Sequence, residues 1–246
     1  IVNAIRSFCL DHGLTIYSTF THTGYLRNLV IRERMHASGL MVNLVTSGDC
    51  PEIMRPLCTL LLSQFPTIST IVNNVTVRKS QVAIGDYEKV YHGPGFITEQ
   101  IGKRTYRVSA NSFFQTNSLQ AARLYDVAAA LARLKPDDVV FDLYSGTGTI
   151  ALHIADKVKE VVGIEVVESS IDDANRNAAA NNVENCTFIQ GDLKDKLTRD
   201  TSWLASHDRP TAMIIDPPRS GMDEKVVLEG ATHHPERIVY VSCNPA

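Results

Sequence analysis

The chain has 246 residues, of which 44% are hydrophobic and 21% charged, with a formal net charge of −3. These values are typical of a globular protein and exclude wholesale disorder. No run approaches the roughly 20 apolar residues of a membrane span, and no signal peptide is recognisable. Five scattered cysteines without a CxxC pair argue against a disulfide framework or a metal site. We therefore expect a cytoplasmic protein without membrane or metal.

Charge divides the chain into two parts. Residues 1–108 hold 11 Lys/Arg and 7 Asp/Glu, net +4, whereas residues 109–246 hold 13 and 20, net −7. We expect a domain boundary at this point, and a basic first domain is compatible with a polyanionic partner such as RNA. Because the chain starts at Ile1 and stops three residues after Cys243, we also expect it to be a fragment of a longer protein.

The first 108 residues have the pattern of an α+β module without a catalytic motif. Apolar residues alternate as in strands, and the spacing of Ile53, Leu57 and Leu60 before Pro66 predicts a helix. In chain order we expect strands at 14–20, 26–32 and 40–45, a helix at 51–65, a strand at 68–77 and short strands within 81–109.

The hydrophobic pattern of the sequence changes near Ser112, where apolar runs of strand length begin to alternate with predicted helices. We expect a helix at 118–134, then strands at 139–143, 161–165, 187–190, 212–215 and 238–242, with helices near 148–156, 170–182, 192–206 and 223–230. Regular alternation with nearly continuous apolar strands predicts an α/β fold with a parallel, doubly wound, Rossmann-like sheet in residues 109–246.

A glycine turn follows the first strand of this sheet and predicts a nucleoside site. Gly146 and Gly148 let the backbone approach a ligand closely, and Glu165 stands 19 residues after Gly146, at the tip of the next strand. There a carboxylate can bind ribose hydroxyls. Asp192 follows the third strand along the same edge.

The identity of the nucleoside cofactor depends on Asp142. A dinucleotide site often has a third glycine, which here is Ala151, a permitted variant, so the spacing alone leaves NAD open. A carboxylate at Asp142 repels a pyrophosphate, however, and suits the cationic amino-acid group of S-adenosylmethionine.

Two further strand ends carry candidate chemistry. Asp216 precedes two prolines that hold a rigid turn, and Cys243 stands beside an Asn-Pro turn. Both follow parallel strands at the edge where open α/β sheets place their sites. Phe113, Phe114 and Gln115 lie before the first helix of the domain, where aromatic rings and an amide can contact a planar ligand.

These motifs resemble one family, the RNA 5-methyluridine methyltransferases, which act on ribosomal and transfer RNA. The resemblance covers about residues 109–246 well and residues 1–108 weakly. It is carried by Asn111-Ser112-Phe113-Phe114-Gln115-Thr116-Asn117, Asp142-Leu143-Tyr144-Ser145-Gly146-Thr147-Gly148, Val162-Gly163-Ile164-Glu165, Asp216-Pro217-Pro218-Arg219-Ser220-Gly221 and Val241-Ser242-Cys243-Asn244-Pro245.

The resemblance implies a class I methyltransferase domain that uses S-adenosyl-L-methionine, preceded by a smaller, RNA-facing domain. By position, Cys243 matches the nucleophile, and the residues that match the cofactor and base pocket are Gln115, Tyr144, Thr149, Glu165, Asp192 and Asp216. Thr149 is often Asn in the family, and Asp192 is sometimes Asn. The family's catalytic base is a Glu downstream of Ala246, and its N-terminal RNA-binding barrel and iron–sulphur cysteines have no counterpart in this sequence.

The function expected from these residues is methylation of carbon 5 of a uridine in RNA. Cys243 would add to carbon 6 of the uracil, with Asp216 and Gln115 contacting the base and Phe113 and Phe114 supporting its pocket. The sequence Phe113-Phe114-Gln115-Thr116-Asn117 favours 23S ribosomal RNA over transfer RNA as the substrate. The alternatives are a class I methyltransferase acting on an amino group, a non-catalytic RNA-binding factor and, third, a dehydrogenase.

Overall fold

The computed structural model describes residues 1–79 and 83–242, which divide into two compact units. Unit 1 comprises Ile1–Glu99 and Val108–Asn111, and unit 2 comprises Gln100–Arg107 and the chain from Ser112 onward. The chain passes between the units twice within a two-stranded sheet of β5 (Phe96–Ile101) and β6 (Arg104–Ser109). In the described ranges, no helix combines the length and apolar character needed to cross a bilayer.

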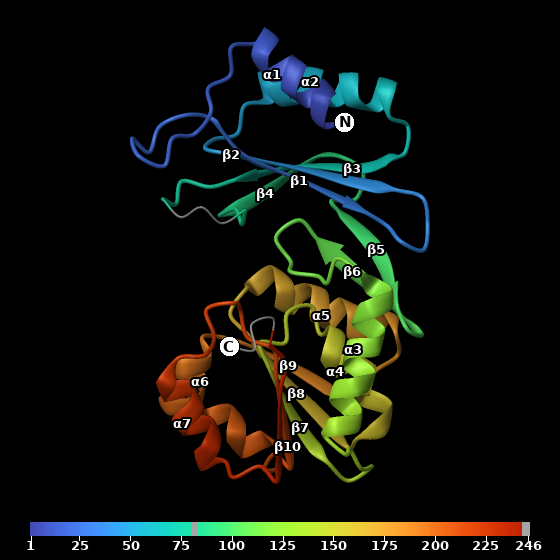
Figure 1. The fold of residues 1–246 in the computed structure, drawn as a ribbon, viewed down its shortest axis with the longest axis vertical. Helices are drawn as coiled ribbons and strands as arrows, with labels where there is room; N and C mark the ends of the chain where they lie inside the picture. The colour runs from blue at the N-terminus through green and yellow to red at the C-terminus, as the bar shows by residue number, and fades with distance from the viewer. Residues whose placement is uncertain (80–82, 243–246) are drawn as a thin grey trace. The chain divides into compact units, whose positions relative to one another are not determined.

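In unit 1, two helices cover one face of a sheet whose described strands have the order β1-β2-β3-β4 (Figure 1). The elements are α1 (Val2–Asp11), β1 (Leu26–Glu33), β2 (Leu40–Thr46), α2 (Pro51–Gln64), β3 (Ile68–Val75) and β4 (Tyr87–His92). Because β2 and β3 are parallel, a crossover is required between them, and α2 provides it. Val42 and Leu44 of β2 pack against Met54, Leu57 and Leu61 of α2 to form the core.

The strand predicted at 14–20 is wrong. These residues form a loop with isolated bridges at Ile16 and Ser18 only. The apolar alternation was misleading because Ile16 is 80% exposed and Phe20 is 93% exposed, so neither faces a core. Helix α1 had not been expected, although Ile5, Phe8 and Cys9 bury one side of it at helical spacing.

Unit 2 confirms the doubly wound α/β prediction. Its described parallel strands have the order β11-β10-β7-β8-β9, with α3, α4 and α5 on one face and α6 and α7 on the other (Figure 1). The strands are β7 (Val139–Leu143), β8 (Glu160–Glu165), β9 (Cys186–Gln190), β10 (Ala212–Ile215) and β11 (Arg237–Tyr240). The helices are α3 (Ser118–Leu131), α4 (Thr149–Ile154), α5 (Glu168–Ala180), α6 (Leu193–Thr198) and α7 (Glu224–Thr232).

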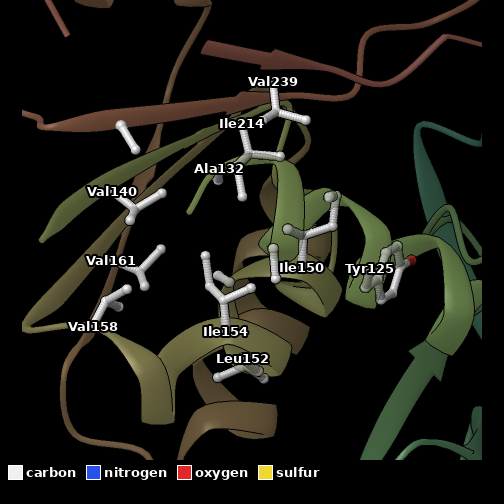
Figure 2. Packing of buried hydrophobic residues seen from close by; sticks show 14 of the residues in the cluster. Tyr125, Ala132, Val140, Ile150, Leu152, Ile154, Val158, Val161, Ile214 and Val239 are labelled. Atoms are coloured by element: carbon white, nitrogen blue, oxygen red, sulfur yellow. The ribbon is translucent and has the colours of Figure 1, made fainter. Parts of the chain in front are cut away.

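Alternate residues of each strand enter two separate cores. Val140, Val161 and Ile214 pack toward α3 and α4, as Figure 2 shows for this cluster. Their neighbours Phe141 and Val162 pack on the opposite face, with residues of α6 and α7. Burial on both faces explains why the sequence of these strands is almost continuously apolar.

The helix predicted at 192–206 is two shorter elements, α6 and a 3₁₀ helix at Ser202–Ser206. Between them the chain turns so that Trp203 packs on Phe141, with ring centroids 5.2 Å apart. Its indole N–H donates to the carbonyl of Lys196 at 3.0 Å. Partial burial of this large ring against Phe141 accompanies the break in the predicted helix.

An ion pair closes the amino-terminal edge of the sheet. Asp138, which is buried, accepts hydrogen bonds from Arg237 of β11 and from the Thr211 hydroxyl at 2.6 Å. Arg237 also donates to the carbonyls of Ala132 at 2.9 Å and Arg133 at 2.7 Å. Burial raises a carboxyl pKa, but the hydrogen bonds from Arg237 and Thr211 outweigh it and lower the pKa of Asp138. The pair joins β11 to β7 and to the end of α3.

Candidate functional site

A hollow of about 290 Å³ lies at the carboxyl-terminal edge of the sheet of unit 2. It is lined by Tyr144, Ile164, Glu165, Val166, Gly191, Asp192, Leu193, Lys194, Asp223 and Val226. Three residues singled out in the sequence, Tyr144, Glu165 and Asp192, are therefore brought together. Tyr144 follows β7, Glu165 ends β8 and Asp192 follows β9, and the parallel order of these strands places their carboxyl ends side by side.

Glu165 holds the loops on either side of the hollow. Its Oε2 accepts a hydrogen bond from the Gly146 N–H at 3.1 Å, and its Oε1 accepts one from the Val167 N–H at 2.9 Å. A carboxylate has about four acceptor sites, so each oxygen keeps a lone pair for a ligand. Glu165 can thus fix the glycine turn and bind hydroxyl groups at once.

Tyr144 has a strained backbone at the end of β7. Its φ is +67°, a left-handed value that bulky residues seldom adopt. Such outliers persist where the surrounding structure enforces them, often at functional sites. Burial raises the pKa of the Tyr144 hydroxyl, and the nearby Asp192 carboxylate raises it further. The ring therefore stays neutral at physiological pH and presents an amphipathic face to the hollow.

The two glycines of the turn have different surroundings. A Cβ added to Gly146 would meet no heavy atom of the described residues within 4 Å, so the chain leaves this space open. A Cβ added to Gly148 would stand 2.7 Å from Cζ of Phe188 and 3.2 Å from Cβ of Ala174. Gly146 is consequently the position where a ligand can approach the backbone, whereas Gly148 is required by packing.

Asp142 is a buried carboxyl beneath the glycine turn. Its Oδ2 accepts from the Ala151 N–H of α4 at 3.0 Å, and its Oδ1 has no hydrogen-bond partner among the described residues. Desolvation raises its pKa to about 8, with a further contribution from the Asp216 carboxylate. Burial raises the pKa of Asp216 as well. A cation bound beside these two carboxyls would stabilise their ionised forms and lower their pKa values, whereas an anion would raise them further, so this edge of the sheet suits a positively charged group better than an anion.

Two helix caps complete the rim of the hollow. Asp192 caps α6 by accepting from the Lys194 N–H at 2.8 Å, and Asp223 caps α7 by accepting from the Lys225 N–H at 2.8 Å. The Lys194 ammonium lies 3.7 Å from the Asp223 carboxylate. Sequence reasoning missed Asp223. An acidic residue before the helix that starts at Glu224 was the available signal.

Four other expected site residues of unit 2 are not among the residues that line this hollow: Gln115, Thr149, Phe113 and Phe114. Gln115 lines a separate, more open hollow of about 420 Å³ beside α3. The Thr149 hydroxyl is 3.0 Å from the Tyr125 hydroxyl. Phe113 is 68% exposed, whereas the Phe114 ring packs against Tyr106 with centroids 6.0 Å apart.

Asp216 and Cys243 follow adjacent strands. Asp216 is half-buried, and its N–H donates to the Leu143 carbonyl at 3.3 Å, at the tip of the sheet. Cys243 lies outside the described residues, which end at Ser242. Because β10 and β11 are parallel neighbours, the chain leaves both at the same edge of the sheet as the hollow.

Known proteins similar in sequence are RNA methyltransferases. An uncharacterised RNA methyltransferase of Chlorobaculum tepidum is 45% identical over 246 residues, which are 100% of this chain and 51% of that protein. One from Lactococcus lactis is 38% identical over 250 residues, with coverage of 100% and 54%. The chain thus spans about half the length of the curated relatives it matches.

A solved structure supports the same relationship. The crystal structure of the Pyrococcus abyssi tRNA (uracil-54, C5)-methyltransferase, in complex with S-adenosyl-L-homocysteine, is 30% identical with a TM-score of 0.75. The match covers 99% of this chain and 56% of that one, which confirms the class I methyltransferase fold. Residues 85–246, more than half of the chain, match the model of the family described as tRNA (uracil-5-)-methyltransferase. The chain belongs to this family of RNA uracil-5-methyltransferases.

Proposed function

We propose that this protein transfers a methyl group from S-adenosyl-L-methionine to carbon 5 of a uridine in RNA. The observation that carries the proposal is the hollow in which Tyr144, Glu165 and Asp192 meet, in a chain of this family. The Pyrococcus abyssi relative was crystallised with the demethylated form of the same cofactor.

The residues of the hollow fit this cofactor. Glu165 has acceptor sites for ribose hydroxyls, and the Tyr144 ring and Ile164 offer apolar surface for a nucleobase. Gly146 leaves space for close approach, and the buried Asp142 has an oxygen without a partner in the described chain, which suits a cationic amino-acid group. When bound, S-adenosylmethionine supplies an electrophilic methyl group on a positively charged sulphur.

We assign the nucleophile to Cys243. Carbon 5 of uracil is a poor nucleophile, but addition of the Cys243 thiolate to carbon 6 converts the ring into an enolate with a nucleophilic carbon 5. Asp216 and Gln115 hydrogen bond to N3 and O4 and stabilise the developing charge. After methylation a general base removes the proton from carbon 5, its electrons form the 5,6 double bond, and the carbon 6–sulphur bond breaks to release the thiolate.

The uridine must leave its helical stack to reach this edge of the sheet, because its carbons 5 and 6 are otherwise shielded. Phe113, with 68% of its surface exposed, and Phe114 supply the aromatic surface for the flipped base. Thr149 supports the turn through its bond to Tyr125 and completes the assigned site.

We propose ribosomal RNA in the cytoplasm as the substrate, supported by the Phe113–Asn117 sequence. A transfer RNA is the second candidate, because the Pyrococcus abyssi relative is a tRNA (uracil-54, C5)-methyltransferase. The mildly basic residues 1–108 are proposed to form the RNA-facing domain.

The proposal is tested with RNA that contains 5-fluorouridine and with methyl-labelled S-adenosylmethionine. The fluorine cannot be removed as a proton, so the adduct is trapped and a denaturation-resistant protein–RNA complex with the label is expected. Ribosomal and transfer RNA transcripts are compared in parallel. Label in RNA without a covalent complex would favour a methyltransferase of another type, and RNA binding without cofactor binding would favour a non-catalytic factor.

Glu165→Ala is expected to weaken binding of S-adenosylhomocysteine by about 2–3 kcal/mol, the loss of charge-assisted hydrogen bonds and of the brace on the Gly146 turn. Isothermal titration calorimetry measures this change. Glu168→Ala, which removes an exposed carboxylate three residues away, is the matched control and should bind like the unmodified chain. Equal affinity of both variants would show that Glu165 is not a ligand.

A further inference from the structure

A loop of unit 1, residues 16–26, presents an aromatic side chain to solvent. Phe20 stands at its tip and is 93% exposed, the largest exposed fraction of any large hydrophobic residue in the described chain. A single exposed apolar residue is ordinary on a protein surface. The Phe20 loop differs from that case because its backbone is fixed and its base carries cations.

Hydrogen bonds fix the shape of the Phe20 loop. The Ser18 hydroxyl oxygen accepts from the Phe20 N–H at 3.3 Å and from the Thr21 N–H at 3.2 Å, and the Ser18 N–H donates to the Thr23 carbonyl at 2.8 Å. Gly24 lets the two sides of the loop meet, since a Cβ there would stand 2.3 Å from the Ile16 carbonyl oxygen. The exposed ring therefore projects from an ordered turn, which lowers the entropy lost when a partner binds it.

Arg27 ties this loop to a basic segment. Its guanidinium carbon lies 4.0 Å from the centre of the Tyr17 ring, and its Nη1 donates to the Arg78 carbonyl at 2.7 Å. The linked segment carries the exposed side chains of Val77, Arg78 and Lys79, of which Arg78 forms an ion pair with Asp86 at 2.6 Å. Arg27 thus joins the loop that carries Phe20 to a segment that exposes the Arg78 and Lys79 side chains.

The immediate neighbours of Phe20 in the sequence are polar. Ser18, Thr19, Thr21 and His22 lie on either side of it in the sequence, and Ile16 is the other large hydrophobic side chain that residues 16–26 expose. An aromatic ring among hydroxyl groups and cations fits a ligand with flat bases and anionic phosphates. Single-stranded nucleic acids are bound through this combination of stacking and positive charge.

We propose that Phe20 stacks on an unpaired base of the RNA substrate, while Arg78 and Lys79 contact its phosphates. This inference rests on the proposed function, because it takes RNA as the substrate. It adds a recognition point on unit 1, separate from the methyl-transfer site on unit 2. The loop would select RNA with an accessible unpaired base over continuous duplex, since the bases of a duplex are already stacked.

The test measures binding of fluorescent 12-nucleotide single-stranded RNA to the 246-residue chain by anisotropy. Phe20→Ala is expected to weaken binding about 5- to 100-fold, the range for loss of one base–aromatic contact. Phe20→Trp should retain binding, and Phe20→Leu should not, because leucine keeps apolar volume without a ring. Leu10→Ala is the matched control, since Leu10 is an exposed apolar residue of α1 at 71% exposure.

Salt dependence separates stacking from charge. Phe20→Ala should leave the slope of log affinity against log salt unchanged, whereas Lys79→Ala should reduce it by about one unit. A single abasic nucleotide is placed at each position of the oligonucleotide in turn. At one position it should weaken RNA binding by the unmodified chain, and at that position it should not weaken binding by Phe20→Ala any further. The position at which the abasic nucleotide affects only the unmodified chain identifies the base that Phe20 contacts.

Two results would overturn the inference in distinguishable ways. If the unmodified chain binds RNA and Phe20→Ala binds it equally well, the stacking contact does not exist while the proposed function stands. If the unmodified chain does not bind RNA of any kind, the proposed RNA substrate fails together with the contact. Circular dichroism of each variant confirms that the change lies in binding and not in folding.

Discussion

Replacing Cys243 with alanine is expected to abolish methyl transfer to uridine, by a factor on the order of 10⁴ or more, because the covalent route loses its nucleophile. No denaturation-resistant complex should form with 5-fluorouridine RNA, and no label from S-adenosylmethionine should reach carbon 5. Binding of S-adenosylhomocysteine should persist, because Tyr144, Glu165 and Asp192, which line the hollow that we assign to it, are intact in this variant.

Cys50→Ala is the control for this experiment. Cys9, Cys50, Cys58 and Cys186 are free thiols in the structure, and Cys50 precedes α2 in unit 1, far along the chain from the site. This variant should form the covalent complex like the unmodified chain. Full methyl transfer by Cys243→Ala would instead assign the chemistry to a methyltransferase without a cysteine adduct, such as one that acts on an amino group.

Asp138→Ala is expected to lower the free energy of unfolding by about 3–5 kcal/mol, because it leaves the Arg237 guanidinium without its carboxylate in a largely buried place. Arg237 begins β11, the strand that leads toward Cys243. In Asp138→Ala we therefore expect methyl transfer to be lost at a lower temperature than cofactor binding, which we assign to the ends of β7, β8 and β9. Urea unfolding followed by Trp203 fluorescence measures the stability.

The loss of stability caused by Asp138→Ala depends on pH, in the direction given by the pKa shift of Asp138. The pKa of Asp138 is lowered from its usual value of 3.8, so its stabilising contribution is present above that value and lost as the pH falls below it. The difference between the two proteins should shrink in acid. Asp208→Ala, which breaks the exposed pair with Lys159, is the control and should leave the unfolding curve in place. Equal losses of stability in both variants would contradict the stabilising role assigned to the Asp138–Arg237 ion pair.

The sequence was informative where one strand tip determines one side chain. The position of Glu165 beside the Gly146 turn could be predicted because parallel strands end at a common edge. A spacing of 19 residues from Gly146 places the Glu165 carboxylate at the end of the next strand. The loop at 14–20 was misread because alternation does not show whether a buried face exists. Asp223 and Leu193 come to the hollow through packing between α6 and α7, a contact between distant segments that no local pattern contains.

The contact between Gly148 and Phe188 has an evolutionary consequence. Any side chain at 148 collides with a ring that also lies 2.7 Å from the Cβ position of Gly163. A mutation at 148 is unfavourable even when residue 188 is smaller, because the φ of +77° at Gly148 is one that other residues rarely adopt, and a smaller residue 188 by itself leaves a cavity. Position 148 should therefore remain glycine among relatives, whereas positions 163 and 188 should change together or not at all, because a Cβ added at 163 would stand 2.7 Å from the Phe188 ring. Their covariation would record the fit between strands and helix, even in a relative that had lost its methyl donor.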